Sequence, residues 1–313
     1  MFPPSFDYRR ADDADEAVAL LADLPDAAVL AGGHDLIPAL KAGRADVGAV
    51  VDVSGIDELA GVREPRNGEN GVIAVGATTT DADLLAVEGL GDRLPAVADA
   101  LCVLGDRQIR NRGTVGGNLA AAHPGSDLPA PAIVADATVD VRSADGERTL
   151  PVTDLLVGDH EVALDDAELV TAVRFEEIEP DAGGAYVKKT HPASGYAMVG
   201  VAARVRLTDQ TLSDPRVAAA GVTDRARRLP GVEDALDGVA VTPEGRPDPE
   251  GLREATSDAA DDLSAASRRG DAHASAEFRA GILPEYVRRA VTRATARAAG
   301  LDPDAVAAAG GER

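Results

Sequence analysis

The stretch IRNRGTVGGNL, residues 109–119, determines how the rest of the chain is interpreted. Its glycines lack a Cβ, so the backbone there can adopt positive φ angles and can approach another group closely. Consecutive N–H groups in such a turn form a concave site for phosphate or pyrophosphate. Hydroxyl and amide side chains can add hydrogen bonds. The stretch therefore predicts an anion-binding turn formed by Thr114, Gly116, Gly117 and Asn118.

A second glycine pair occurs in AGGHD, residues 31–35, between the apolar run 27–30 and the segment LIPAL, residues 36–40. This order predicts a strand, a glycine turn and the start of a helix. Two such turns would suit one ligand with two phosphates. A single glycine pair is more typical of a tight loop than of a nucleotide site. Neither stretch matches the G-x-G-x-x-G fingerprint or the P-loop pattern, so spacing alone leaves both interpretations open.

Three stretches together carry a resemblance to a known family: AGGHDLIP at 31–38, IRNRGTVGGN at 109–118 and DLPA at 127–130. They resemble the FAD-binding medium subunit of the molybdenum hydroxylases, the family of carbon monoxide dehydrogenase and xanthine dehydrogenase. Further landmarks follow in family order, namely SFDY at 5–8, VGATT at 75–79 and GYA at 195–197. The resemblance therefore covers nearly the whole chain.

The resemblance implies an α+β chain of two domains. A two-subdomain FAD-binding domain of the PCMH type would occupy residues 1–178, with subdomains at about 1–55 and 56–178. A smaller C-terminal flavoprotein domain of antiparallel sheet plus helices would occupy residues 184–313. The stretch EEIEPDAGG at 176–184 is typical of a linker because of its charge, proline and glycines.

Hydrophobic spacing and turn residues predict the elements of both domains. We expect strands at 28–30, 47–53, 71–77, 138–142 and 169–175, then antiparallel strands at 186–189, 199–207 and 216–221. We expect helices at 82–86, 94–101, 128–135, 232–236, 252–263 and 278–299, and an earlier helix that carries residues 17–24 and is capped by Asp12 or Asp13.

The resemblance also implies which residues bind FAD. They are Ala31, Gly32, Gly33, His34, Asp35, Thr78, Thr79, Thr114, Gly116, Gly117, Asn118, Asp127 and Lys188. Many relatives carry Ser or Thr where Asp35 stands. Because a carboxylate repels phosphate, we assign the contacts of this turn to its backbone amides and expect Asp35 to cap the following helix.

Several of these residues have a second interpretation. Thr78 and Thr79 can be helix caps or flavin contacts. Asp127 is expected both to cap the helix at 128–135 and to accept hydrogen bonds from ribose hydroxyls. The resemblance places Tyr196 beside the reactive ring of the flavin, whereas by itself it is typical of a packed turn aromatic. Lys188 or Lys189 could offset negative charge at the flavin, or each could be a solvated surface residue.

Composition excludes several classes of function. The 313 residues carry a net charge of −23 and contain three lysines, which argues against binding to nucleic acid or to anionic membranes. Acid excess, few lysines and few aromatics fit a surface adapted to high salt. The chain has neither an N-terminal signal pattern nor 18 consecutive apolar residues, so we expect a soluble cytoplasmic protein without membrane insertion.

Metal and disulfide chemistry are not expected within this chain. The single cysteine, Cys102, excludes an internal disulfide, and its apolar neighbours predict that it is buried. The five histidines show no ligand spacing, so we infer no metal site.

The family's chemistry implies partners. A substrate would be oxidised in a large molybdopterin subunit, and electrons would pass through iron–sulfur clusters of a small subunit to the FAD of this chain and then to an external acceptor. The chain would thus be an oxidoreductase subunit, active only in a hetero-oligomer. Two alternatives stay open: a free-standing FAD-dependent oxidoreductase, which would need its own base and pocket, and a scaffold that kept the fold without the cofactor.

The acid excess leads to a prediction about salt. Because dissolved ions screen repulsion between crowded carboxylates, with a Debye length of about 3 Å at 1 M salt, the midpoint of thermal unfolding should rise as potassium chloride increases well beyond physiological concentration. Thermal melts across a salt series measure this. A flat or falling midpoint would show that the acid excess is not an adaptation to salt.

Overall fold

The structure is a computed structural model that describes residues 2–63 and 71–309. Its contacts divide the chain into two units, each described separately below. Unit 1 comprises Met1–Glu88, Gly105–Ala122 and Ala137–Phe175, and unit 2 comprises Gly89–Leu104, His123–Asp136 and Glu176–Arg313. Two segments of the expected FAD-binding domain, 89–104 and 123–136, thus pack with the C-terminal residues. The domain boundary between 178 and 184 stays a prediction.

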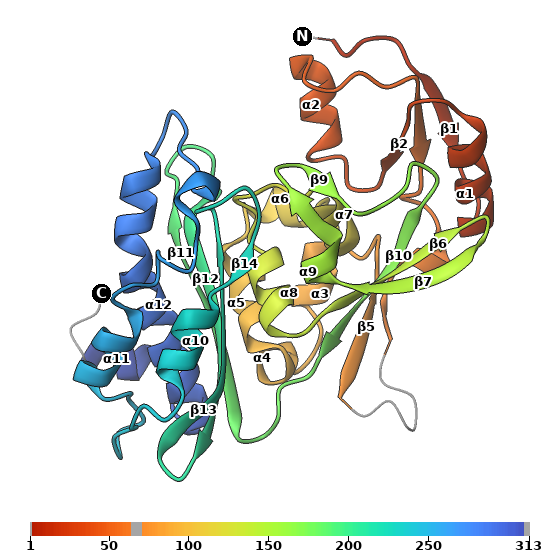
Figure 1. Cartoon of the computed structure of the whole chain (residues 1–313). Helices are drawn as coiled ribbons and strands as arrows, with labels where there is room; N and C mark the ends of the chain where they lie inside the picture. The colour runs from red at the N-terminus through yellow and green to blue at the C-terminus, as the bar shows by residue number, and fades with distance from the viewer. Residues whose placement is uncertain (1, 64–70, 310–313) are drawn as a thin grey trace. The chain divides into compact units, whose positions relative to one another are not determined.

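Unit 1 begins with a small parallel sheet in the order β1 (Asp7–Arg10), β3 (Ala49–Asp52), β2 (Ala27–Leu30). Helix α1 (Ala14–Asp23) begins where the Asp13 carboxylate accepts a hydrogen bond from the backbone N–H of Glu16, as predicted. Its apolar face packs Val18 and Leu21 against Val51. Helix α2 (Leu36–Ala42) follows the end of β2, so the residues 31–35 lie at the carboxyl end of a parallel strand (Figure 1).

The second sheet of unit 1 has five strands in the order β4 (Val62–Arg63), β5 (Val72–Gly76), β10 (Leu169–Glu176), β6 (Thr138–Ser143), β7 (Gly146–Pro151). Helices in this unit are short: α3 (Asp81–Leu85), α6 (Arg107–Arg110), α7 (Val115–Ala120), α9 (Val152–Leu155) and the 3-10 turn Asp57–Leu59. A two-stranded ribbon of β8 (Leu156–Gly158) and β9 (Glu161–Val162) completes it.

Unit 2 is built on a four-stranded antiparallel sheet of β11 (Ala182–Thr190), β12 (Ala197–Thr208), β13 (Thr211–Ala220) and β14 (Arg227–Arg228). Adjacent glycines in β11 show that both faces are covered. A Cβ on Gly183 would lie 2.0 Å from the carbonyl oxygen of Ala294 in α12 (Ala276–Ala298), whereas one on Gly184 would lie 3.1 Å from Pro95 in α5 (Pro95–Val103). Because successive strand residues point to opposite faces, α12 and α5 lie on opposite sides of this sheet.

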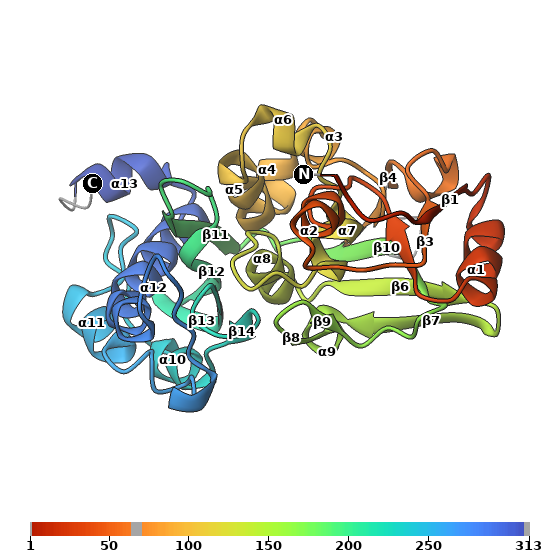
Figure 2. The same cartoon turned by 90° about the horizontal axis from the view of Figure 1, so that it is seen from above.

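Other helices of unit 2 complete the two layers. α10 (Pro230–Leu236) and α11 (Pro249–Thr256) share the hydrophobic cluster of α12, and α8 (Pro129–Val134) contacts β12 and β13. Figure 2 shows α10, α11 and α12 together beside β11–β13 in a second view. The remaining helices are α4 (Leu90–Arg93), α13 (Pro303–Ala309) and the 3-10 turn Ala265–Ser267.

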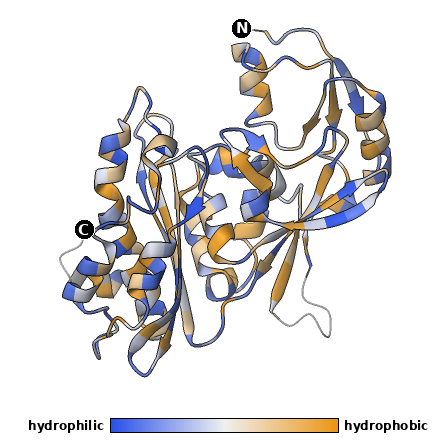
Figure 3. Cartoon of the chain, in the orientation of Figure 1, coloured by the Kyte–Doolittle hydropathy of each residue, from blue (hydrophilic) through white to orange (hydrophobic). Residues whose placement is uncertain are grey.

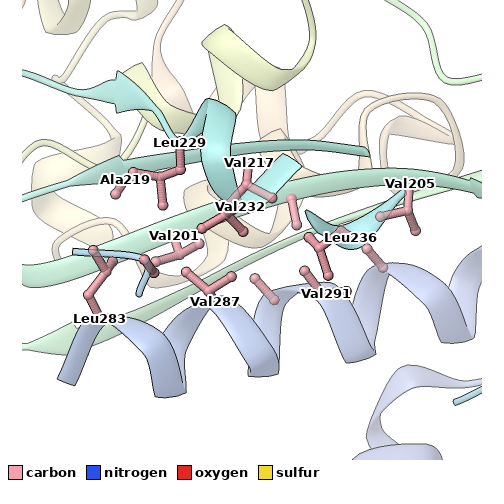
Figure 4. Close-up of a cluster of buried hydrophobic side chains, with 14 of the residues drawn as sticks. Val201, Val205, Val217, Ala219, Leu229, Val232, Leu236, Leu283, Val287 and Val291 are labelled. Atoms are coloured by element: carbon pink, nitrogen blue, oxygen red, sulfur yellow. The ribbon is translucent and has the colours of Figure 1, made fainter. Parts of the chain in front are cut away.

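The core between α12 and the sheet is made of small aliphatic side chains. Leu283, Val287 and Val291 extend from one face of α12 toward Val201 and Val217 of the sheet (Figure 4). All five are at most 1% exposed. Figure 3 shows the matching alternation of hydrophobic and hydrophilic residues along α12. At roughly 1.5–3 kcal/mol for each fully buried aliphatic side chain, this layer fixes the sheet that carries part of the candidate site.

Two expectations about elements were wrong. Helix α11 ends at Thr256 rather than Leu263, because Ser257 and the following Asp-rich turns interrupt it. Cys102 is exposed rather than buried, since it lies on the outer side of α5 while Ala100 and Leu101 face inward. Strands β1 and β7 were not predicted, because their side chains are almost all exposed and do not alternate.

Within the described residues, no helix combines the length and the apolarity needed to span a membrane.

Candidate functional site

In unit 1, the segments 77–81 and 113–116 run side by side. The backbone N–H groups of Asp81, Val115 and Gly116 donate to the carbonyl oxygens of Gly113, Thr79 and Ala77 at 2.9, 3.0 and 3.0 Å. The central glycine stretch is therefore bonded to the threonine cluster that lies about 35 residues before it in the chain. This pairing brings together the predicted site residues Thr78, Thr79, Thr114 and Gly116.

The first glycine turn packs against the same place. A Cβ on Gly32 would lie 2.0 Å from the carbonyl oxygen of Arg112, and one on Gly117 would lie 4.0 Å from the Cβ of Ala31. The turn at 31–35 and the stretch at 112–117 are thus neighbours in unit 1, as one shared ligand would require. Of the four paired glycines only Gly33 has a positive φ, 78°; Gly32, Gly116 and Gly117 are needed for close packing instead.

The central stretch is helical, not a turn as predicted. Gly116, Gly117 and Asn118 lie within α7, and Thr114 is the residue before its first turn. The Thr114 side chain makes no capping hydrogen bond, and a Cβ on Gly117 would lie 2.5 Å from its hydroxyl oxygen. Glycine at position 117 therefore leaves space for the Thr114 hydroxyl.

Three buried ring-nitrogen and hydroxyl-oxygen atoms in these stretches lack a hydrogen-bond partner among the described residues. They are His34 Nε2, Thr78 Oγ1 and Thr114 Oγ1. A buried polar group without a partner costs about 1–3 kcal/mol, so such groups concentrate where a ligand supplies the missing bond. All three belong to the residues expected to bind the cofactor, and they fit a group rich in phosphate and hydroxyl oxygens.

The expected helix caps at Asp35 and Asp127 were wrong, and for Thr78 and Thr79 the structure rules out the cap as one of the two alternatives. The cap of α3 is Thr80, whose hydroxyl accepts from the backbone N–H of Asp83, and neither Thr78 nor Thr79 takes part; Thr79 donates to the carbonyl oxygen of Gly61 instead. Asp35 stands at the start of α2 but makes no capping bond. Asp127 does not cap α8, which begins after Leu128.

In unit 2, the Asp127 carboxylate is held by two side chains of β11. The Tyr186 hydroxyl donates to Oδ1 at 2.7 Å, and Lys188 Nζ donates to Oδ2 at 2.8 Å. The side chains of Asp127 and Lys188 are 5% and 3% exposed. The interpretation of Lys188 as a solvated surface residue is therefore wrong, while Lys189, which points to the other face of the strand, is exposed.

Burial is the largest influence on the pKa values of Asp127 and Tyr186. Loss of hydration raises the pKa of Asp127 above its ordinary value, although the Lys188 charge and the hydrogen bonds from Lys188 and Tyr186 act to lower it. Burial, together with the neighbouring Asp127 carboxylate, raises the pKa of Tyr186 well above its ordinary value. Tyr186 therefore stays protonated and remains a hydrogen-bond donor to Asp127.

Tyr196 lies at the end of the turn that joins β11 to β12, and the residue is 39% exposed. Its ring stacks on that of His123, with centroids 4.1 Å apart and an interplanar angle of 18°. The backbone N–H of Ala197 donates to the carbonyl oxygen of Gly125 at 3.1 Å. The segment 123–127 therefore contacts both Tyr196 and the residue that follows it.

A second ion pair supports the start of β12. Arg279, 4% exposed, donates through Nη1 to the carbonyl oxygens of Met198 and Gly221 at 2.7 and 2.8 Å. Its Nη2 donates to Asp271 Oδ2 at 2.6 Å. Partial burial acts to raise the pKa of Asp271, but the backbone N–H groups of His273 and Ala274 and the Arg279 charge outweigh it and lower that pKa to about 2.

Sequence analysis missed Tyr186, His123 and Arg279 as parts of this arrangement. One signal was available for Tyr186: Gly200 lies inside a 12-residue strand, where glycine often marks a close approach. A Cβ at position 200 would lie 2.3 Å from the Tyr186 hydroxyl. His123 and Arg279 contact the Tyr196 region from distant parts of the chain, and no spacing rule predicts such contacts.

Residues 2–63 and 71–309 contain no cluster of three His, Cys, Asp or Glu side chains placed to hold a metal ion.

Comparisons with known proteins give a consistent result along the chain. A family model described as the FAD binding domain in molybdopterin dehydrogenase matches residues 4–175, and one described as the CO dehydrogenase flavoprotein C-terminal domain matches residues 185–294. The carbon monoxide dehydrogenase medium chain of Hydrogenophaga pseudoflava is 34% identical over 300 residues, covering 96% of this chain and all of that protein.

A second relative and a solved structure agree. The 6-hydroxypseudooxynicotine dehydrogenase complex subunit alpha of Paenarthrobacter nicotinovorans is 31% identical over 308 residues, covering 95% of this chain and 97% of that protein. The structure of carbon monoxide dehydrogenase from Hydrogenophaga pseudoflava matches with a TM-score of 0.87 at 33% identity, covering 95% of this chain and 99% of the matched chain.

The lowered pKa of Asp271 yields a pH prediction. A carboxylate whose pKa falls from 3.8 to about 2 on folding stabilises the folded state above pH 3.8, and this contribution is lost as the pH falls toward 2. Asp271→Asn should therefore lower the midpoint of urea unfolding by a constant amount from pH 7 to about pH 4, and the difference from wild type should shrink below that pH. A difference that stays constant down to the acid limit would contradict the assignment.

Proposed function

Because the chain belongs to the FAD-binding medium subunits of the molybdenum hydroxylases, we propose that it takes electrons from iron–sulfur clusters of a small partner subunit and passes them to an external acceptor. The substrate is oxidised in a large molybdopterin subunit of the same hetero-oligomer. When bound, FAD supplies the redox chemistry of this chain, since it can take up and release electrons. We further propose that the complex works in the cytoplasm.

The observation that carries this proposal is the set of buried atoms without partners at His34, Thr78 and Thr114. These atoms come from the three stretches that converge in unit 1, and each is suited to hydrogen-bond an oxygen-rich group. Unpaired buried polar atoms destabilise the folded chain, and a bound dinucleotide would supply the hydrogen bonds that they lack. A scaffold that had lost the cofactor would have no reason to keep all three.

We assign the phosphate-bearing part of FAD to the residues of unit 1. Backbone amides of the 31–35 turn and the side chains of Thr114 and Asn118 would bind it, and Thr78 would add a hydroxyl. The proposed set is Ala31, Gly32, Gly33, His34, Asp35, Thr78, Thr79, Thr114, Gly116, Gly117 and Asn118. In unit 2 we assign Lys188 and Tyr196 to the flavin environment and Asp127 to the ribose hydroxyls of the nucleotide portion.

A free-standing FAD-dependent oxidoreductase is the remaining alternative. It would need a pocket and a proton-accepting group for its own substrate. In unit 2, the Asp127 carboxylate is buried and accepts one hydrogen bond on each oxygen, from Tyr186 and from the Lys188 ammonium group that pairs with its charge. This engagement argues against its use as a catalytic base and favours the role of a subunit.

Removal of one unpartnered hydroxyl should separate binding from folding. Thr114→Val should lower FAD affinity about tenfold, or ~1.4 kcal/mol, while leaving the stability of the cofactor-free protein unchanged or higher, because the hydroxyl bonds nothing in the protein. Thr171→Val is the matched control, since its hydroxyl donates to the carbonyl oxygen of Asp140 at 3.2 Å. The control should lower stability and keep the affinity. Unchanged FAD affinity in folded Thr114→Val would remove Thr114 from the site.

Reconstitution tests the subunit role. The isolated chain should bind FAD yet fail to oxidise candidate substrates such as carbon monoxide or purines, and partner subunits from the same source should restore turnover. Substrate-dependent bleaching of the flavin is measured for the chain alone and after co-expression. Turnover by the chain alone would contradict the subunit role and support the free-standing enzyme.

A further inference from the structure

We propose that Lys188 and Asp127 position Tyr196, so that this buried ion pair acts on the flavin ring through the turn at 191–196 rather than by direct contact with that ring. The inference concerns the flavin residues of the proposed function and therefore rests on it. All the contacts that carry it lie within unit 2.

The Lys188 ammonium group connects Asp127 to the turn that precedes Tyr196. Its Nζ donates to Asp127 Oδ2 and also to the carbonyl oxygen of Gly195, each at 2.8 Å. Gly195 directly precedes Tyr196 and has a positive φ of 76°, so the turn must hold a conformation that is costly for other residues. The ammonium group thus links the loop before α8 to the peptide that sets the direction of the Tyr196 side chain.

Asp127 is itself fixed, so it can serve as the anchor. The Tyr186 hydroxyl holds its second oxygen, and Gly200 on the neighbouring strand leaves the space that this hydroxyl fills. Removing one partner of a buried ion pair leaves an uncompensated charge, which is strongly destabilising. The two hydrogen bonds of Lys188 Nζ therefore hold the turn at Gly195 against Asp127.

Tyr196 receives further contacts from the same loop and from within its turn. His123 stacks on its ring, and the Nδ1 of His123 accepts from the backbone N–H of Gly125 at 3.1 Å, which orients the imidazole. The carbonyl oxygen of Tyr196 accepts from the backbone N–H of His191 at 2.9 Å. The ring of Tyr196, its carbonyl group and the preceding peptide are thus each restrained, although the residue is 39% exposed.

The first experiment measures the turn without any cofactor. The double variant Asp127→Asn/Lys188→Met removes both charges while keeping similar volumes, which avoids an unpaired buried ion. Amide hydrogen exchange of a peptide covering residues 191–198 should become about tenfold faster in this variant. Lys189→Met is the control, because it removes the same charge from the exposed neighbour and should leave the exchange unchanged. Exchange within twofold of wild type in the folded double variant would overturn the proposal.

The second experiment separates positioning from direct contact. Tyr196→Ala and the double variant Asp127→Asn/Lys188→Met, which leaves no uncompensated buried charge, are compared separately and in combination for the rate of flavin reduction by dithionite and for the flavin absorption spectrum. If the ion pair acts through Tyr196, its removal should add nothing once Tyr196 is alanine. Additive effects would show direct action of the ion pair on the flavin and would overturn the proposal.

The two experiments also distinguish this inference from the function on which it rests. If wild-type protein binds no FAD but the double variant exchanges faster at 191–198, the positioning of Tyr196 stands and the proposed function fails. If FAD binds and exchange is unchanged, the proposed function stands and the positioning role fails.

Discussion

Gly32 has no Cβ, and the carbonyl oxygen of Arg112 occupies the space where one would lie. This close approach depends on glycine, because any side chain would separate the turn at 31–35 from the stretch at 112–117. Hydrogen bonds between 77–81 and 113–116 add a third segment to the same place in unit 1. The unpartnered atoms of His34, Thr78 and Thr114 exist together only because these three segments converge. These unpartnered atoms are the observation on which the proposed binding of FAD by unit 1 depends.

In unit 2, a buried ion pair on the sheet holds the candidate residues in place. Its aliphatic core fixes the sheet, and alternation along β11 then sends Tyr186 and Lys188 to the face opposite α12. There they meet Asp127, and Lys188 extends the connection to the turn of Tyr196. A buried ion pair contributes little net stability compared with apolar residues, but it has few alternative geometries. In this chain, the ion pair matters because it restrains the geometry of an otherwise exposed turn.

Much of this could be predicted from the sequence. The ordered motifs were sufficient to recognise the family, and the comparisons confirm it, together with the α+β fold and FAD as the cofactor. The strands at 199–207 and 169–175 were found because their apolar residues leave little ambiguity. The local capping rule failed at Asp127, because its hydrogen bonds with Tyr186 and Lys188 outweigh a cap worth about 1 kcal/mol. The stacking of His123 on Tyr196 was unpredictable, since it depends on contacts between segments about 70 residues apart.

The proposed function requires that this chain binds FAD by itself in its folded state. Titration of purified chain with FAD, followed by the flavin absorption bands and by calorimetry, measures it most directly. We expect saturation at one FAD for each chain and a rise in the unfolding midpoint with FAD concentration, as binding to the folded state alone requires. A folded chain that shows neither saturable binding nor a shifted midpoint would contradict the account.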